Sequence, residues 1–245
     1  MTPSIAVLHL LLVLGNPALA WAGEARYPTL SQGVKDRAAR EIIEQATLSH
    51  AIPRLRLSGN RRAYEFLLNH PSLAVQLARH LHPPMQQYTV TPVAEGQYHV
   101  EALGALRGTA HLILAEPGRS AYRVEGDFHS LANLLRFSGR MVATFGYREV
   151  RERNKASMES DLYVYLRVDS RLLGLLMTKL LTPLIVRLID RRVEMLVEGG
   201  RIVLARVTEG PKSLYREMTQ WKDLRPEDLE LFRKTFLHRP TKRSR

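Results

Sequence analysis

The chain has 245 residues, of which 45% are hydrophobic and 24% charged, and its formal net charge is +12. This is the composition of a globular protein of one or two domains. The chain has no cysteine, which excludes disulfide bonds, a lipoprotein anchor and thiol nucleophile chemistry. The positive charge favours anionic partners such as a phospholipid surface. Nucleic acid is not expected, because no aromatic residues interleave the basic runs at 147–155 and 238–245 at a spacing suited to base stacking.

The N-terminal segment predicts export. Residues 4–15 form an uncharged apolar run, which precedes Pro17 and an Ala-Leu-Ala sequence ending at Ala20. This is the pattern of a secretory signal peptide. It predicts cleavage near Ala20 and a mature protein in the periplasm or outside the cell. No Lys or Arg precedes the apolar run, so an uncleaved membrane anchor is the alternative.

The first part of the mature chain is expected to contain three helices and one strand. The leading helix would be capped by Ser31 and would place Val34, Ala38 and Ile42 on one face. Pro71 separates the other two helices, because proline disfavours a helical conformation in the residue before it. The expected elements are a helix at 27–49, a strand at 52–60, and helices at 61–69 and 72–81.

A meander of six strands is expected next. Turn residues separate six runs in which apolar and polar positions alternate. In the last run the even-numbered positions from Ala156 to Val168 are mainly apolar, and the charged residues occupy odd positions. This alternation indicates an antiparallel sheet with one buried face. The runs are 85–93, 97–103, 108–115, 121–128, 139–150 and 155–168.

A long helix follows the strands. Residues 172–189 contain only two charges, Lys179 and Arg187, and are nearly long enough to cross a bilayer, which takes about 20 residues. A helix packed in the concave face of a curved sheet needs a continuous polar stripe, whereas a membrane-spanning helix does not. The helix is therefore expected to be enclosed by the sheet. The polar stripe comprises Lys179, Pro183, Arg187, Asp190 and Glu194.

The ends of this helix follow from capping residues. Asp169 or Ser170 can cap its start, and the Gly199-Gly200 pair is a natural stop. Residues 201–207 fit either a strand or a continuation of the helix. Two short helices are expected beyond them, at 211–218 and 226–237.

The order of elements resembles a known fold. With 63–81 as paired helices and 163–192 as the last strand and gripping helix, the chain resembles the helix-grip fold of the START-like superfamily, which includes polyketide cyclases and lipid-transfer domains. The resemblance covers about 52–199 and rests on element order rather than on a catalytic motif. It implies an α+β fold in which a curved antiparallel sheet of six or seven strands wraps around a long C-terminal helix, with extra helices at both ends. The expected divisions are a signal peptide at 1–20, a leading helical segment at 21–50, the helix-grip domain at 51–200, and a C-terminal extension with a basic tail at 201–245.

The resemblance also implies a cavity between sheet and helix that holds an apolar ligand. A sheet curved around one helix favours the same arrangement, and the alternative is that these side chains close-pack as core. Arg192 falls near the inward face of the helix, where it would bind a ligand carboxylate or phosphate, pair with a strand carboxylate such as Asp127, or reach solvent. The expected lining residues are Met177, Leu181, Leu184, Ile185, Leu188, Arg192, Met195, Tyr122, Tyr147, Met158 and Leu162, with Tyr98 as a further candidate hydroxyl.

Catalytic chemistry has little support in the sequence. No zinc-protease, serine-hydrolase, phosphate-loop or dinucleotide motif is present. His80 and His82 lie two residues apart on a helix and point to different sides. His111 alternates with a leucine, and Asp127 and His129 share a strand end, but such neighbours are common. No catalytic residue, metal or cofactor is expected.

The leading functional prediction is an exported protein that binds a lipid or other hydrophobic small molecule and carries it between membranes, with an anionic membrane surface as a docking partner. One alternative is an enzyme on the same fold, resembling a cyclase or hydrolase, which would require His111, Asp127 and a tyrosine to face one point. The other alternative is a structural protein kept at the membrane by an uncleaved N-terminus.

Overall fold

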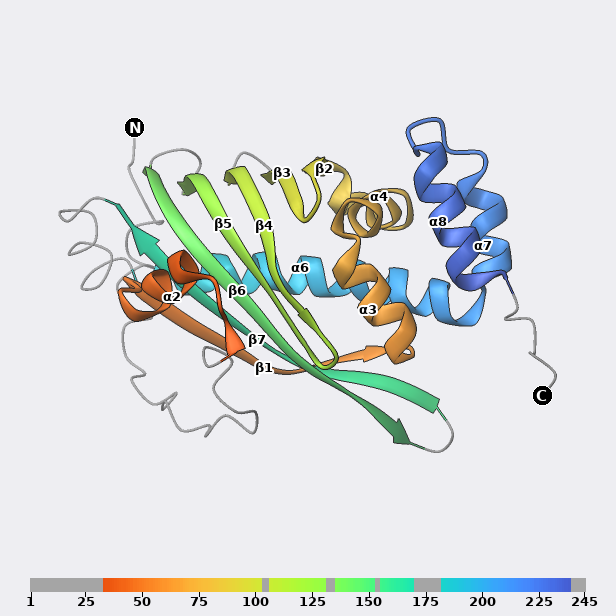
Figure 1. Cartoon of the computed structure of the whole chain (residues 1–245), viewed down its shortest axis with the longest axis horizontal. Coiled ribbons are helices and arrows are strands. Elements are labelled where there is room, and N and C mark those ends of the chain that lie inside the picture. The colour runs from red at the N-terminus through yellow and green to blue at the C-terminus, as the bar shows by residue number, and fades with distance from the viewer. Residues whose placement is uncertain (1–32, 103–105, 131–134, 153–154, 170–181, 239–245) are drawn as a thin grey trace, which may run out of the picture.

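A curved antiparallel sheet of seven strands organises the chain (Figure 1). The computed structural model describes residues 33–102, 106–130, 135–152, 155–169 and 182–238. The strand order is β1-β7-β6-β5-β4-β3-β2, so β2 to β7 form the expected meander and β1 closes the sheet beside β7. All seven expected strands are confirmed, some with longer bounds: β1 (Leu48–Ser58), β2 (Tyr88–Ala94), β3 (Gln97–Ala102), β4 (Leu106–Glu116), β5 (Arg119–Ser130), β6 (Leu135–Glu152) and β7 (Lys155–Val168).

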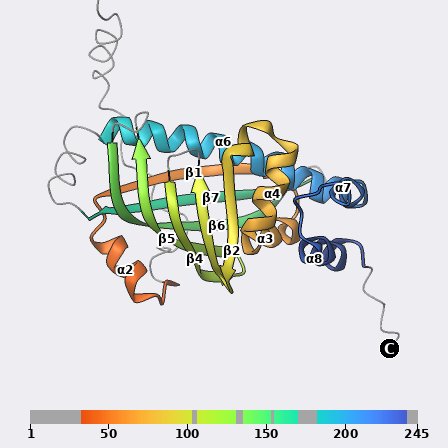
Figure 2. The ribbon, with the colours of Figure 1, turned by 90° about the horizontal axis from the view of Figure 1, so that it is seen from above.

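A row of glycines allows the sheet to bend. The pairing register places Gly108 of β4, Gly126 of β5 and Gly139 of β6 side by side. A Cβ on Gly108 would lie 2.1 Å from the carbonyl oxygen of Glu125, and a Cβ on Gly126 would lie 2.3 Å from that of Arg107. The neighbouring backbones therefore approach too closely for any side chain, as happens where a sheet curves sharply. Figure 2 shows the strong curvature of the central strands.

Two helices cover opposite faces of the sheet (Figure 1). We call these the α2 face, covered by α2 (Arg37–Glu44), and the α6 face, covered by α6 (Thr182–Glu209). Along β7 the even-numbered residues from Met158 to Val168 are buried, as the alternation predicted. Asp161 is buried as well, although it lies on the α2 face. Its carboxylate accepts the backbone N–H of Arg54 at 2.8 Å, where β1 bulges.

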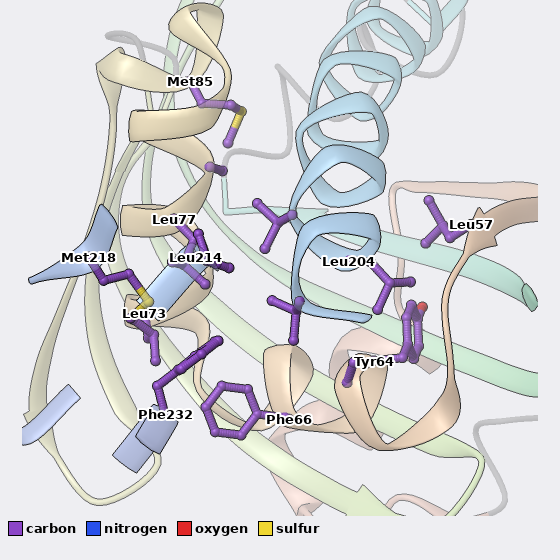
Figure 3. Close-up of a cluster of buried hydrophobic side chains, with 14 of the residues drawn as sticks. Leu57, Tyr64, Phe66, Leu73, Leu77, Met85, Leu204, Leu214, Met218 and Phe232 are labelled. Atoms are coloured by element: carbon purple, nitrogen blue, oxygen red, sulfur yellow. The ribbon is translucent and has the colours of Figure 1, made fainter. Parts of the chain in front are cut away.

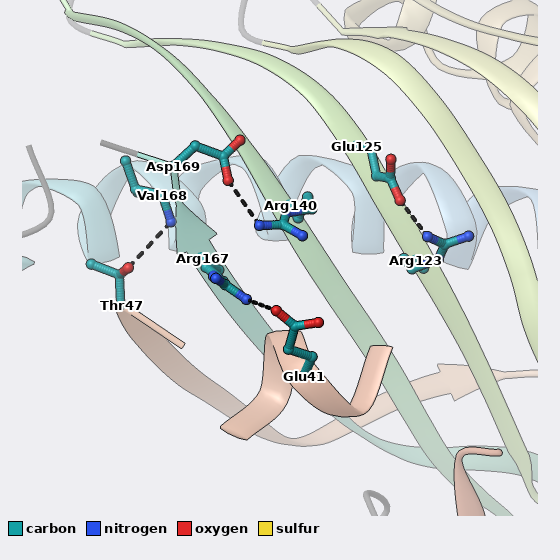
Figure 4. A network of polar contacts seen from close by, with 8 residues as sticks. All are labelled: Glu41, Thr47, Arg123, Glu125, Arg140, Arg167, Val168 and Asp169. Carbon is teal, nitrogen blue, oxygen red and sulfur yellow. Dashed lines mark hydrogen bonds and ion pairs between the residues drawn. The ribbon is translucent and has the colours of Figure 1, made fainter. Parts of the chain in front are cut away.

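The leading helix is shorter than expected. It begins at Arg37 rather than near Ser31, because the Asp36 carboxylate accepts the backbone N–H of Ala39 at 2.7 Å and caps it there; Ser31 lies outside the described residues. An ion pair between Glu41 and Arg167, 2.6 Å long, ties α2 to β7 (Figure 4). The hydrogen bond and charge of that arginine hold the pKa of Glu41 below its usual range. The helix buries Ala39 and Ile42 against Ala121 and Val142 of the sheet, and Val34, which precedes the helix, joins the same cluster.

The paired helices are confirmed as α3 (Arg61–Asn69) and α4 (Pro71–Leu81). The side chain of Asn60 caps α3 by accepting the backbone N–H of Ala63 at 2.9 Å. Pro71 starts α4, where its missing N–H has no cost. His70 is the residue between the two helices, as the proline rule predicts.

The long helix does not end at Gly199-Gly200, and that expectation is wrong. α6 continues to Glu209, so 201–207 is helix rather than strand. The glycine serves close packing instead: a Cβ on Gly199 would lie 3.0 Å from Cγ of Met85 and 3.7 Å from Cβ of Ala78 on α4. The expected start of the helix at 170–181 lies outside the described residues. Within the described part of the chain, no helix is long and apolar enough to span a membrane.

The C-terminal segment belongs to the main core. The expected short helices are confirmed as α7 (Pro211–Met218) and α8 (Pro226–Phe236), and Figure 3 shows their apolar side chains packed against α3, α4 and α6. Position 200, the expected end of the helix-grip domain, therefore falls inside a helix whose later residues contribute to this core. The core includes Leu57, Tyr64, Phe66, Leu73, Leu77, Val203, Leu204, Leu214, Met218 and Phe232.

The glycine row can be tested by matched Gly→Ala changes. Gly126→Ala is expected to lower the free energy of unfolding by about 1–3 kcal/mol or more, because the new Cβ would overlap backbone atoms that cannot move independently. Gly200→Ala should raise it by about 0.5–1 kcal/mol, because nothing lies within 4 Å of the new Cβ and alanine favours helix. Urea denaturation followed by circular dichroism measures both. A neutral Gly126→Ala variant would contradict the proposed origin of the bend.

Candidate functional site

The α6 face of the sheet is apolar over its whole width. Strand register aligns its residues in rows that cross the strands. One row runs through Tyr98, Ala110, Val124, Met141 and Leu166. The next runs through Leu112, Tyr122, Ala143 and Val164. A ligand between sheet and helix would therefore meet a nearly continuous apolar wall.

Part of the centre of this face is accessible to solvent although a helix covers it. Five side chains on β4, β5 and β6 are only half-buried, whereas Ala110 and Val124 on the same strands are buried, as are Leu162, Val164 and Leu166 on β7. α6 packs most closely against β1 at one edge of the sheet, and against α4 and the 3-10 turn η2 (Pro83–Gln87) beside β2 at the other. We call the half-buried set the central apolar surface; it consists of Leu112, Tyr122, Met141, Ala143 and Phe145.

Two of the expected lining residues belong to the packed core instead of this surface. Met158 has no exposed surface and Tyr147 is 4% exposed, and both lie in the main core cluster with Leu57 and Leu204. The Tyr147 hydroxyl donates to a carboxylate oxygen of Glu65 at 3.4 Å or to a backbone carbonyl at 3.3 Å. Burial, reinforced by the charge of Glu65, raises the pKa of Tyr147 to about 12. This end of the α6 face is filled.

The remaining expected lining residues are spread over three regions. Leu162 is buried on the α6 face of β7, and Met195 on α6 is partly buried against the main core. Tyr122 lies in the central apolar surface. The helix residues Leu184, Ile185, Leu188 and Arg192 are part of α6, but their side chains lie outside the described residues, as do Met177 and Leu181 entirely. Their lining roles stay predictions.

Two tyrosines on this face differ in how their hydroxyls are used. Tyr122 donates a hydrogen bond to the backbone carbonyl of Leu68 in α3, and burial raises its pKa above the usual range. Burial also raises the pKa of Tyr98. Among the described residues, none forms a hydrogen bond with the Tyr98 hydroxyl.

The groups considered for acid-base chemistry do not converge. His111 and Asp127 lie on the α2 face, where they pair in register with Arg123 and Arg107. Asp127 is exposed and accepts a hydrogen bond from the Ser138 hydroxyl at 2.6 Å. The sheet itself separates it from Tyr98, Tyr122 and Tyr147, and from any other group on the α6 face. The expected constellation of His111, Asp127 and a tyrosine is therefore not formed, and Asp127 is not placed to pair with an inward-facing Arg192.

The histidines on α4 have a structural role. His80 stacks on Trp221, with ring centroids 4.0 Å apart, and its Nε2 lies 2.8 Å from a carboxylate oxygen of Asp223. These contacts join α4 to the segment between α7 and α8. The part of the chain that the structure describes contains no group of three or more His, Cys, Asp or Glu side chains able to hold a metal ion.

Sequence reasoning missed Leu112, Met141 and Ala143, the non-aromatic centre of the face. The alternation within 108–115 and 139–150 could have assigned them to the apolar side of their strands. Alternation does not show which strands lie at the middle of the sheet or under which part of the helix, because register is a property of paired strands.

Comparisons with known proteins give only distant structural likenesses. No protein-family model matches the chain, and no curated protein matches its sequence. A conserved protein from Geobacillus kaustophilus superposes with a TM-score of 0.43 at 9% identity, over 66% of this chain and 98% of that one. Norcoclaurine synthase from Thalictrum flavum superposes with a TM-score of 0.40 at 13% identity, over 76% of this chain and 96% of that one. Ara h 8.0201 superposes with a TM-score of 0.39 at 12% identity, over 64% of this chain and 99% of that one.

The last two proteins have the helix-grip fold. TM-scores below 0.5 at these identities say nothing about ligand or activity. The α+β helix-grip assignment rests on the strand order of this chain and on the helix enclosed by its curved sheet.

Matched Ala→Leu changes on opposite faces can test whether the central apolar surface borders free space. Ala143→Leu is expected to change the free energy of unfolding by less than about 0.5 kcal/mol. Ala121→Leu should lower it by about 1–3 kcal/mol, because Ala121 has no exposed surface and is enclosed by α2. Chemical denaturation of both variants provides the comparison. If both variants lost the same free energy of unfolding, the α6 face at Ala143 would be as tightly filled as the α2 face at Ala121.

Proposed function

We propose that the chain is a binding protein that holds a lipid or other apolar small molecule between the sheet and α6. The supporting observation is the central apolar surface, whose half-buried side chains lie under a helix rather than on the outside of the protein. Covering apolar area that water reaches is favourable by roughly 25 cal/mol per Å². A bound apolar molecule would provide that cover. Apolar sites with a few polar groups are the usual form of small-molecule sites.

A binding role fits the polarity of the two faces better than catalysis does. The ionisable groups of β4 and β5, including His111 and Asp127, lie on the α2 face. The α6 face of these strands carries apolar side chains, glycines, one tyrosine and Ser120. Acid-base catalysis needs a titratable group within hydrogen-bond distance of the substrate. We therefore propose no catalytic residue.

We further propose that the protein is exported and works at or between membranes. The apolar run at 4–15 with its small-residue sequence ending at Ala20 supports export. The net charge of +12 supports electrostatic attraction to anionic lipid. Together they fit a soluble carrier that exchanges its ligand with a membrane.

The binding proposal predicts a co-purifying ligand. Full-length protein would be isolated from the periplasm without detergent, and organic extracts of it analysed by mass spectrometry. We expect about one apolar molecule per chain, and several-fold less in Ala143→Leu, because the added side chain occupies the ligand's place. Val93→Leu is the control, since Val93 is 63% exposed at the edge strand. Empty protein that folds normally, and that also fails to take up added lipid, would contradict the proposal.

Export can be tested separately. Expressed with its own N-terminus in a Gram-negative host, the chain should be released with the periplasmic fraction and should begin at Trp21 on N-terminal sequencing. Retention of the uncut chain in carbonate-washed membranes would favour the anchored alternative.

A further inference from the structure

The polar character of the ligand can be inferred from two tyrosines of the α6 face, Tyr98 and Tyr122, given the proposed binding function. Tyr98 on β3 and Tyr122 on β5 flank β4 and belong to one apolar cluster. Their hydroxyls are close enough for Tyr98 to contribute electrostatically to the raised pKa of Tyr122. A ligand over the centre of the sheet would contact both rings.

The Tyr122 hydroxyl is already used within the protein. It donates its only proton to the carbonyl of Leu68, in the last turn of α3. Carbonyl groups in the last turn of a helix have no partner inside the helix, so this bond satisfies a group that would otherwise lack one. Tyr122 therefore has a structural role and no proton to offer a ligand.

The Tyr98 hydroxyl is available. Its side chain is only 9% exposed, yet none of the described residues donates to or accepts from the hydroxyl. A buried hydroxyl that lacks a protein partner gains free energy when a ligand atom completes its hydrogen bond.

The sheet around Tyr98 offers no charge to a ligand. Between β2 and β7, the charged side chains on the described part of the α6 face are Glu149 and Arg151, which pair with each other at the filled end. There the Glu149 carboxylate accepts the backbone N–H of Arg61 and the side chain of Arg151, each at 2.9 Å. A carboxylate or phosphate placed near Tyr98 would lose its hydration without gaining a cation from the sheet.

We infer that the ligand is a neutral amphiphile: an apolar body carrying a hydroxyl or carbonyl oxygen that hydrogen-bonds to Tyr98. The phenol is suited to either oxygen because it can both donate and accept. Apolar contacts with the central surface would provide most of the affinity, and Tyr98 would set the orientation of the molecule.

Naphthalene, 2-naphthol and 2-naphthoate form a matched probe series for this inference, with binding measured by fluorescence titration of delipidated full-length protein. The wild type should bind 2-naphthol more tightly than naphthalene, and both more tightly than 2-naphthoate. Tyr98→Phe should reduce the preference for 2-naphthol over naphthalene by a factor of roughly 2 to 10, with thermal stability unchanged. Tyr64→Phe is the control: the Tyr64 hydroxyl donates to Ser160 at 3.1 Å within the main core, so the change should lower thermal stability and keep the preference.

The outcomes separate this inference from the proposed function. A preference for 2-naphthol that survives in Tyr98→Phe would overturn the role of Tyr98 while leaving the binding function intact. Tighter binding of 2-naphthoate than of 2-naphthol would overturn the neutral ligand class and point to a cation on α6. Failure of all three compounds to bind folded protein would count against both proposals.

Discussion

The close approach of backbones at Gly108, Gly126 and Gly139 is the constraint on which the other features of this fold depend. If the residues of this row carried side chains, the backbones of β4 and β5 could not lie as close together as they do, because each Cβ would overlap the backbone of the neighbouring strand. Because the sheet bends, one helix can contact β1 at one edge and α4 beside the other edge. The α6 face thus becomes an interior surface, which α6 crosses (Figure 1).

The two ends of that interior surface are stabilised differently. At one end α3, α4, α6, α7 and α8 form a dense apolar core, in which Gly199 allows α6 to approach Met85 and Tyr147 fits beneath α3. This core holds the sheet and α6 together without filling the centre of the sheet. The central strands present half-buried apolar side chains, and in the proposed function a ligand would cover them.

The separation of charge between the two faces supports the same division of roles. Glu41, Arg123, Arg140 and Arg167 form ion pairs on the α2 face or at its rim (Figure 4). Such pairs are exposed, contribute little to stability individually, and keep charged groups away from the interior. On the α6 face the polar groups over the central strands are few and neutral. Under the proposed function, the interior would favour an uncharged apolar molecule over a charged one because of the cost of desolvating the charge.

The sequence by itself determined the elements and their faces. Period-two alternation predicted all six strands of the meander and the buried side of β7, and Pro71 predicted the break between α3 and α4. Only the tertiary structure decided that Gly199 is a packing contact rather than a helix end, that three glycines on different strands form one row, and that Met158 is core whereas Ala143 lies in the central apolar surface. Alternation and capping act between neighbours along the chain, so they can be recognised locally. Register and helix packing join residues far apart, so the same glycine or tyrosine has no assigned role until its partners across the sheet are known.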